Sequence, residues 1–407
     1  MNASLWRNRE FNLLWTSQTL SDLGDGVATL ALALLVLVQT GDPVSAGLVG
    51  TLASVARLVC RLPAGVIADR FDRRRLMLAC DCVRLLAFTV LTVAVVTGRA
   101  SLPLIIAAAV FDAAFGALFG TAEDASLRSI VPIEQLPDAV ARNEARSYGA
   151  MLAGPPLGGL LFSVGHAVPF LGNAVSYLVS LVMVGAIRKP LQAPRDKDVP
   201  VRFAEGLRFV LTHPFLRMLM LIAAPLNFAI GGVVFAVVVA LQSGGTAPAV
   251  IGLVETVVAV GGLLGAVAAP RLQRRLGLTV LVRVICWLAV VLLASAALLT
   301  SSVAAAVPLA LTVFLGPAGN AALFGYQAAI TPDHLQGRVV SVIMMAATSM
   351  AALAPVVAGS LVAAFGAPTA ILVFAGSVAV SALGATFGTG LSRTAGENRW
   401  SAAAERC

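Results

Sequence analysis

Long apolar stretches separated by short polar segments recur along the whole chain. A helix needs about 20 mostly apolar residues to cross the hydrocarbon core of a bilayer. The first stretch is too long for the apolar region of a signal peptide, so we expect it to remain as a span. Twelve stretches are predicted to be membrane-spanning helices: 12–38, 44–68, 76–97, 102–121, 140–163, 166–187, 215–241, 248–269, 277–299, 303–325, 338–363 and 367–390.

The composition agrees with this pattern. Of 407 residues, 59% are hydrophobic and only 12% are charged, about half the charged share of soluble domains. The mean hydropathy is +0.93. A soluble core of this size would leave far more surface to be covered by charged side chains. Soluble, disordered and collagen-like proteins are therefore excluded, and an integral membrane protein is expected.

Positive charge is distributed unevenly over the two sides of the predicted spans. The net charge is +8, and nearly all Arg and Lys fall in the polar segments on one side. The opposite side receives only Arg99. Because cytoplasmic loops accumulate Arg and Lys, both termini are predicted to be cytoplasmic in a cell inner membrane. This distribution accounts for the basic charge, so the bilayer is the expected partner and nucleic acid is not.

The longest polar segment, 188–214, divides the spans six and six. We therefore predict an N-terminal bundle over 1–187, a cytoplasmic loop over 188–214, a C-terminal bundle over 215–392 and a tail over 393–407. The expected fold class is an all-α polytopic membrane protein with two pseudo-symmetric six-helix bundles.

The two halves also share short motifs at an offset of 200 residues. Three pairs match: Gly65-x-x-Ala68 with Gly265-x-x-Ala268, Ile130-x-Pro132 with Ile330-x-Pro332, and Pro155-x-x-x-Gly159 with Pro355-x-x-x-Gly359. Two facing bundles can rock about a central site, which is how secondary transporters with internal repeats work. The repeat therefore favours a secondary transporter over a channel or a membrane-embedded enzyme.

The loop after the second span reads Gly-Val-Ile-Ala-Asp-Arg-Phe-Asp-Arg-Arg-Arg over 65–75. It resembles the signature loop of the major facilitator superfamily, except that Asp72 replaces the usual glycine. Further residues resemble the bacterial subgroup of enterochelin exporters and macrolide and multidrug efflux proteins, among them Leu23-Gly24-Asp25 and Phe203-x-Glu205-Gly206-Leu207. The resemblance implies the major facilitator fold.

The resemblance also implies a gating role for this loop, carried by five residues: Gly65, Asp69, Arg70, Arg73 and Arg74. Asp69 can pair with Arg73 or Arg74, and the arginines can cap helix C-termini across the cytoplasmic gap. Such contacts would hold in one conformation and break in the other. The alternative is that the arginines only determine the topology.

A second motif lies in the fifth span. Gly154-Pro155-Pro156-Leu157-Gly158-Gly159 resembles the G-P-x-x-G-G element of drug–proton antiporters, carried here by Gly154, Pro155, Gly158 and Gly159. The element is associated with exporters, so it favours efflux. Small residues also let helices approach closely, and generic close packing is the alternative.

Ionisable residues inside the first two spans need partners, because an unpaired charge in hydrocarbon is costly. The first span holds Asp22 and Asp25, and the second holds Arg57 and Arg61. Counting from the cytoplasmic ends places the acids and the arginines at similar depths. We therefore predict the pairs Asp25–Arg57 and Asp22–Arg61, which could also respond to substrate or protons.

Other spans hold further acids. Asp81 and Arg84 are three residues apart and are predicted to pair on one face of the third span. Asp112 and Glu255 have no obvious partner, and an unpaired acid in low dielectric can exchange a proton. The candidates for proton coupling are Asp25 first, then Glu255 and Asp112, with Asp22 and Arg57 beside them. A structural carboxyl group is the alternative for each.

The substrate cavity is expected to be apolar and aromatic with few charges. Candidates at mid-depth are Trp15, Phe111, Phe115, Tyr148, Asn227, Phe228 and Phe235. No metal site is expected, because His166, His213 and His334 lack partners at metal-ligand spacing. There is no G-x-x-x-x-G-K-S/T loop, so neither ATP nor another cofactor is expected.

Together these patterns predict a proton-coupled antiporter, not an enzyme, that exports a small amphipathic or apolar compound such as a drug, antibiotic, siderophore or secondary metabolite. A monomer is expected. One alternative is a proton-coupled importer of a small metabolite. Another is a membrane-embedded transferase with Mg²⁺ at Asp69-x-x-Asp72, which would need a second acidic loop where 269–275 is Arg-rich.

Overall fold

The computed structural model describes residues 5–192, 203–332 and 335–387, and all of its regular structure there is helical. The helices are η1 (Leu5–Arg7), α1 (Arg9–Thr40), α2 (Pro43–Arg70), α3 (Arg73–Val96), α4 (Leu102–Ile130), η2 (Ile133–Gln135), α5 (Leu136–Val164), α6 (Val168–Gly185), α7 (Phe203–Thr212), α8 (Pro214–Ser243), α9 (Pro248–Arg275), α10 (Leu278–Ala297), η3 (Val303–Ala305), α11 (Ala306–Ile330), α12 (Gln336–Ala352), α13 (Ala354–Phe365) and α14 (Ala367–Phe387). Residues 193–202 of the predicted central loop, the predicted tail at 393–407, and His334 lie outside the described residues.

Eleven helical segments in the described ranges are long and apolar enough to cross a membrane, with α12 and α13 together forming one of them. The remaining predicted stretch, 140–163, lies in α5, which is 29 residues long. The first half of α5 carries Asp138, Arg142, Glu144 and Arg146, which lower its hydropathy. The prediction of an all-helical, multi-span membrane protein is confirmed.

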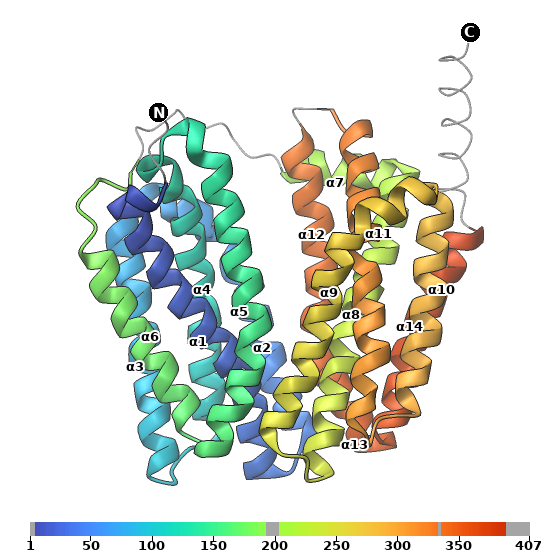
Figure 1. Cartoon of the computed structure of the whole chain (residues 1–407), viewed down its shortest axis with the longest axis horizontal. Helices are drawn as coiled ribbons and strands as arrows, with labels where there is room; N and C mark the ends of the chain where they lie inside the picture. The colour runs from blue at the N-terminus through green and yellow to red at the C-terminus, as the bar shows by residue number, and fades with distance from the viewer. Residues whose placement is uncertain (1–4, 193–202, 333–334, 388–407) are drawn as a thin grey trace. The chain divides into compact units, whose positions relative to one another are not determined.

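The chain divides into two compact units. Unit 1 contains residues 1–197 and 245–256, and unit 2 contains residues 198–244 and 257–407. In unit 1, α1 packs mainly against α5 and α6, while α4 packs against α2 and α3 (Figure 1). In unit 2, α8 packs against α12, α13 and α14, and α10 packs against α11 and α14. The predicted domain limits at 187 and 215 stay a prediction.

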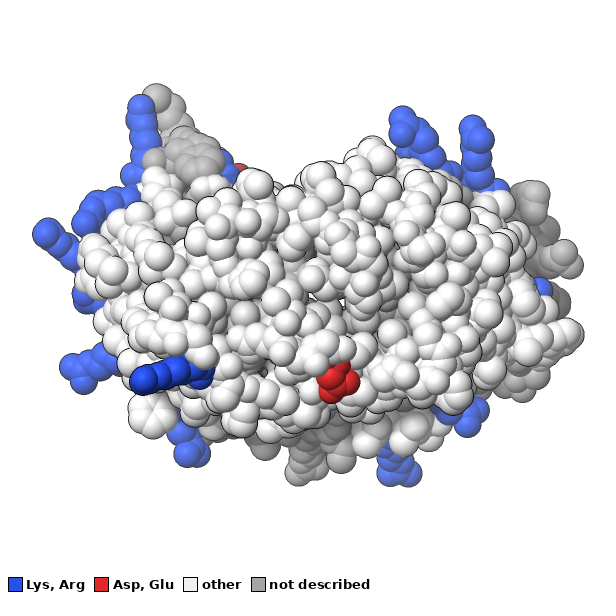
Figure 2. Space-filling view, turned by 90° about the horizontal axis from the view of Figure 1, so that it is seen from below, with Lys and Arg blue, Asp and Glu red and all other residues white. Residues whose placement is uncertain are grey.

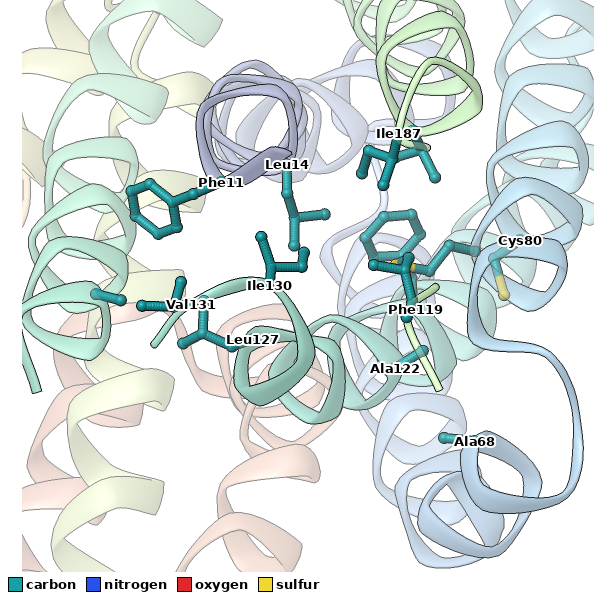
Figure 3. Packing of buried hydrophobic residues seen from close by; sticks show 14 of the residues in the cluster. Phe11, Leu14, Ala68, Cys80, Phe119, Ala122, Leu127, Ile130, Val131 and Ile187 are labelled. Atoms are coloured by element: carbon teal, nitrogen blue, oxygen red, sulfur yellow. The ribbon is translucent and has the colours of Figure 1, made fainter. Parts of the chain in front are cut away.

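A hydrophobic core fills one end of unit 1, near the start of α1. Figure 3 shows Phe11 and Leu14 of α1 beside Ile130 at the end of α4, and Phe119 near Cys80 in the same cluster. Asn8 links the two elements, because its side chain caps α1 by accepting from Phe11 N and donates to the Ile130 carbonyl at 3.1 Å. This end of α1 is thereby fixed against α4.

The internal repeat of the sequence is reflected in the structure, because matching helices of the two halves end at equivalent residues. α4 ends at Ile130 and α11 ends at Ile330, and each is followed two residues later by a proline, which cannot continue a helix. The fifth span of each half differs, because α5 runs unbroken through Pro155 and Pro156 whereas its counterpart is interrupted at Leu353, between α12 and α13. The halves therefore share a plan but not the details of each helix.

Few charges occur in the turns α1–α2, α3–α4 and α5–α6 of unit 1. Asp42 and Arg99 are the only Asp, Glu, Lys or Arg residues in these three turns. The view from below in Figure 2 accordingly shows mostly neutral side chains. Asp42 caps α2 by accepting from the backbone N–H groups of Val44 and Ser45. The hydrogen bond from the Ser45 hydroxyl, with these two N–H groups, lowers the pKa of Asp42.

Candidate functional site

Four helices of unit 1 meet around the guanidinium of Arg84 on α3. Its Nη2 lies 2.6 Å from Asp25 Oδ2 on α1, and its Nε lies 2.9 Å from Asp112 Oδ1 on α4. Nη2 also donates to the Tyr177 hydroxyl of α6 at 2.8 Å. The Arg84 side chain is only 4% exposed. We call Asp25, Arg84, Asp112 and Tyr177 the Arg84 cluster.

Tyr177 is fully buried and connects the two acids of this cluster. Its hydroxyl lies within hydrogen-bonding reach of Asp25 Oδ1 and, at 2.5 Å, of Asp112 Oδ1. One hydroxyl has one proton, so it donates to only one carboxylate at a time. Asn173 Nδ2, one turn earlier on α6, donates to the Tyr177 hydroxyl oxygen at 3.0 Å. The arginine also lies over the tyrosine ring, 4.1 Å from its centroid.

The predicted pairs Asp25–Arg57 and Asp22–Arg61 are wrong. Asp25 pairs with Arg84, while Arg57 and Arg61 are exposed on α2. The physical reason is packing, because α1 packs mainly against α5 and α6, and α2 packs mainly against α4. Equal depth along two helices that are consecutive in sequence does not put their side chains on facing surfaces.

The predicted Asp81–Arg84 ion pair on one helix face does not form, although the two side chains interact electrostatically. Asp81 instead accepts a hydrogen bond of 2.6 Å from Ser180 of α6. The expectation that Asp112 lacks a partner is wrong as well, because Arg84 and Tyr177 both reach it. Glu255 on α9 makes no ion pair or side-chain hydrogen bond with the described part of the chain.

A second buried ion group was missed by the sequence reasoning. Arg146 of α5 lies between Asp22 of α1, with Nε 3.0 Å from Oδ2, and Glu123 of α4, with Nη1 2.7 Å from Oε1. By charge distribution alone, Arg146 belongs to the arginines on the predicted cytoplasmic side, which are expected to determine topology. Its position inside a predicted span was the available signal. We call Asp22, Glu123 and Arg146 the Arg146 cluster.

The two clusters have the same charge count. Each has two carboxyl groups and one guanidinium, which is one formal negative charge in excess when both acids are ionised. A buried ion pair is stable only when its hydrogen bonds are satisfied, and an uncompensated charge there is expensive. Taking up one proton per cluster would remove the excess, which is the chemistry that proton coupling requires.

The loop between α2 and α3 is anchored by Arg73. The guanidinium is buried and donates to the carbonyl groups of Ala68, Ala125 and Leu191, at 3.4, 2.8 and 3.2 Å. It also forms an ion pair with Asp69 at 3.3 Å. Since these carbonyls belong to α2, α4 and the segment after α6, a single side chain ties three parts of unit 1 together.

Arg74 reaches a helix C-terminus, as a cation does most favourably. It donates to the carbonyl of Gly185, the last residue of α6. Gln192 adds to the anchor by donating to the Asp69 carbonyl at 3.3 Å. Arg70 is exposed, and a Cβ at Gly65 would meet no atom within 4 Å. All of these contacts lie within unit 1, and the gating role of the five residues stays a prediction.

The glycines of the G-P-x-x-G-G element lie at close contacts of α5, two of them with α1 and one with α9. A Cβ at Gly154 would lie 2.7 Å from the Gly26 backbone, and one at Gly158 would lie 2.7 Å from the Val27 carbonyl oxygen. One at Gly159 would lie 2.1 Å from the Pro248 carbonyl in the first turn of α9, a part of unit 1, while Pro155 contacts Gly252 there. Close packing is therefore a property of this element, and its antiporter role stays a prediction.

We expect Gly158→Ala to lower the thermal unfolding temperature of the purified protein, because the added methyl group must push the α1 backbone away. Overpacking of this kind costs about 1–3 kcal/mol. Gly149→Ala is the matched control on the same helix, since a Cβ there meets no atom within 4 Å. Equal unfolding temperatures for the two variants in fluorescence-detected size-exclusion chromatography would contradict this account of the element.

The seven cavity candidates divide between the units. Trp15, Phe111, Phe115 and Tyr148 belong to unit 1, and Asn227, Phe228 and Phe235 belong to unit 2. In unit 1, the Trp15 indole donates to the Arg142 carbonyl at 3.3 Å, the ring centroids of Phe111 and Phe115 are 6.3 Å apart, and Tyr148 is exposed. In unit 2, the Asn227 side chain donates to the Ala223 carbonyl at 2.8 Å, and the ring of Phe228 packs against that of Phe374 with centroids 5.0 Å apart. Phe235 is half-buried. Their role in substrate binding stays a prediction.

Comparison with known protein families decides what kind of molecule carries these clusters. The profile of the Major Facilitator Superfamily matches residues 14–355, which is most of the chain. The protein belongs to the major facilitator superfamily. Members of this superfamily are transporters rather than enzymes, so this chain is a multi-pass membrane transporter.

Several curated members of the superfamily are similar to this transporter. The multidrug efflux pump Tap of Mycolicibacterium fortuitum is 28% identical over 373 residues, which cover 84% of this chain and 87% of Tap. The MFS-type transporter YkuC of Bacillus subtilis and the enterobactin exporter EntS of Escherichia coli are each 26% identical. Both alignments cover 56% of each chain, so the transporter matches little more than half of these two relatives.

Solved structures agree on the fold. A bacterial homologue of the human lysosomal transporter Spinster superposes with a TM-score of 0.77 over 94% of this transporter and 97% of the homologue, at 16% identity. A bacterial homologue of the iron transporter ferroportin superposes with a TM-score of 0.74 over 94% and 99%, at 19% identity. The major facilitator fold predicted from the sequence is confirmed.

Proposed function

We propose that this transporter is a proton-coupled exporter of small apolar or amphipathic compounds, such as drugs, antibiotics, siderophores or secondary metabolites. The observation that carries the proposal is the Arg84 cluster, in which two carboxyl groups share one buried guanidinium. The excess acid in a span can bind a proton from one side of the membrane and release it on the other. Alternating access between two bundles would connect that proton to substrate movement.

Two further observations support export rather than uptake. A multidrug efflux pump and an enterobactin exporter are among the similar proteins. The G-P-x-x-G-G element resembles that of drug–proton antiporters, and its residues Gly154 and Gly158 pack α5 against the backbone of α1. We propose that both termini are cytoplasmic, because the turns remote from them carry so few charges.

Within the Arg84 cluster we assign the proton to the pair Asp25 and Asp112. Asp25 is the more accessible of the two, with its side chain 32% exposed against 13% for Asp112. Arg84 and Tyr177 contact both acids, so protonation of either one redistributes the hydrogen bonds of all four groups. Glu255 stays a second candidate for proton coupling.

The test is an efflux assay in a pump-deficient host, with a panel of fluorescent lipophilic dyes, macrolides and catecholate siderophores. We expect at least one compound to be extruded, extrusion to stop when a protonophore is added, and Asp25→Asn to abolish it. Asp138→Asn, which removes an exposed acid from the first turn of α5, is the matched control and should leave extrusion unchanged.

Three outcomes would count against the proposal. Accumulation of a compound inside cells that express the protein would support the importer instead. Extrusion that persists with the protonophore would remove proton coupling. Wild-type extrusion by Asp25→Asn would make the Arg84 cluster structural and move the proton site to Glu255.

A further inference from the structure

The Arg146 cluster has no part in the function proposed so far, although it is as deeply buried as the Arg84 cluster. The Arg146 side chain is 5% exposed and that of Glu123 is 6% exposed. Asp22 is more open, at 29%. A charged group of this kind inside a span is costly to retain, which makes it a candidate for function rather than for stability.

The two clusters repeat one arrangement. In each, an arginine lies between an acid of α1 and an acid of α4. Arg84 belongs to α3 and Arg146 belongs to α5, so two different helices each supply an arginine to the acids of α1 and α4. Each arginine therefore links α1 to α4 as long as both of its acids are ionised.

The spacing of the acids connects the clusters to each other. On α1, Asp22 and Asp25 are three residues apart, on successive turns. On α4, Asp112 and Glu123 are eleven residues apart, close to three full turns, so they lie on one face about 16 Å apart along the axis. The two clusters therefore lie at different levels along α4, with Asp112 at one level and Glu123 at the other.

We propose that Glu123 is a second proton-carrying residue of this transporter, and that Arg146 transmits its protonation state to Asp22 and thereby to α1. This inference rests on the proposed proton coupling. When Glu123 is ionised, Arg146 is shared between α4 and α1. When Glu123 takes up a proton, Asp22 is the acid that stays in an ion pair with Arg146, and the ion pair that joins Arg146 to Glu123 of α4 is released.

The charged groups around Glu123 are consistent with this role. Asp22 approaches from α1 and Arg146 from α5, while Asp124 follows on α4 itself. Asp124 is exposed and interacts with Arg146 of α5, and also with Arg61 of α2 and Glu144 of α5. From α3, the buried Arg73 bonds the Ala125 carbonyl rather than a carboxylate of α4. Arg146 is therefore the one cation, among the described residues, that forms an ion pair with Glu123.

The test uses the purified full-length protein in liposomes and pH-difference infrared spectroscopy, which needs no substrate. Exposed carboxyl groups ionise below about pH 5, so a carboxyl band that titrates between mildly acidic and alkaline pH reports buried acids. We expect Glu123→Gln to lose one component of this band. Asp138→Asn, which removes an exposed acid from the first turn of α5, is the matched control and should keep the whole band.

A wild-type band in Glu123→Gln would overturn the inference. If the glutamine variant does not yield folded protein by size-exclusion chromatography, Glu123→Asp replaces it. That variant keeps the carboxyl group at a shorter reach from Arg146, so its component should shift, and an unshifted band would overturn the inference equally. The proposed function fails separately, by persistence of wild-type extrusion when a protonophore is added.

Discussion

Arg84→Gln is expected to have the largest effect of any single substitution considered, a loss of about 3–5 kcal/mol in the free energy of unfolding of unit 1. The change leaves Asp25 and Asp112 without the guanidinium that both contact. It also removes the guanidinium that donates to the Tyr177 hydroxyl and lies over the Tyr177 ring. Expression level and thermal unfolding temperature in detergent measure the loss, and both should fall steeply.

Arg57→Gln is the matched control for this prediction. It removes an equal charge from the neighbouring span α2, where the arginine is exposed. A triple variant that also carries Asp25→Asn and Asp112→Asn should regain much of the stability, because removing all the charges costs less than stranding two acids. Stability of Arg84→Gln equal to that of Arg57→Gln would show that the cluster does not hold unit 1 together.

The second large effect is expected at Arg73. Arg73→Ala removes the hydrogen bonds to the carbonyls of Ala68, Ala125 and Leu191, with the Asp69 ion pair, and leaves three acceptors without that donor. A hydrogen bond to a charged group makes a net contribution of about 1.5–3 kcal/mol. Because water can replace part of these bonds at the end of the bundle, a loss on the order of 3 kcal/mol is expected. Thermal unfolding of the purified protein measures it.

Two further variants separate anchoring from gating in this loop. Arg75→Ala removes an exposed arginine two residues away and should change stability by no more than about 0.5 kcal/mol. Asp69→Asn should also cost little stability, because the Asp69 side chain is 70% exposed. If the loop is a gate, Asp69→Asn still loses transport of the extruded compound. Normal transport in that variant would reduce the loop to an anchor and a topology signal.

The fold could be predicted from the sequence more completely than the candidate site could. The spans could be predicted because each is a continuous run of apolar residues, and the bilayer requires such a run whatever its neighbours are. The repeat could be predicted because helix ends such as Ile130-x-Pro132 and Ile330-x-Pro332 are encoded locally by proline. The close packing at Gly154 and Gly158 could likewise be anticipated from small residues at helical spacing.

The partners of the buried charges could not be predicted. Asp25 and Asp112 were correctly expected inside spans, but their shared arginine lies on α3 and was expected to pair with Asp81 on its own helix. Glu123 and Arg146 escaped notice because each lies near a predicted span end, where a charge can reach water. The position of Arg146 inside the predicted span 140–163 is a weak signal, and nothing in the local sequence of Glu123 distinguishes a solvated charge from one that a neighbouring helix covers.

The sequence by itself determined that this chain spans a membrane many times, in two related halves, with ionisable residues retained inside the first half. These are consequences of hydropathy and local backbone chemistry, which act through residues close together in the chain. Only the tertiary structure decided that α1 faces α5 and α6 rather than α2, and therefore that Asp25 meets Arg84 and Asp22 meets Arg146. A charged side chain takes its partner from whichever helix packs against it, and that neighbour is selected by the shape of whole helix faces.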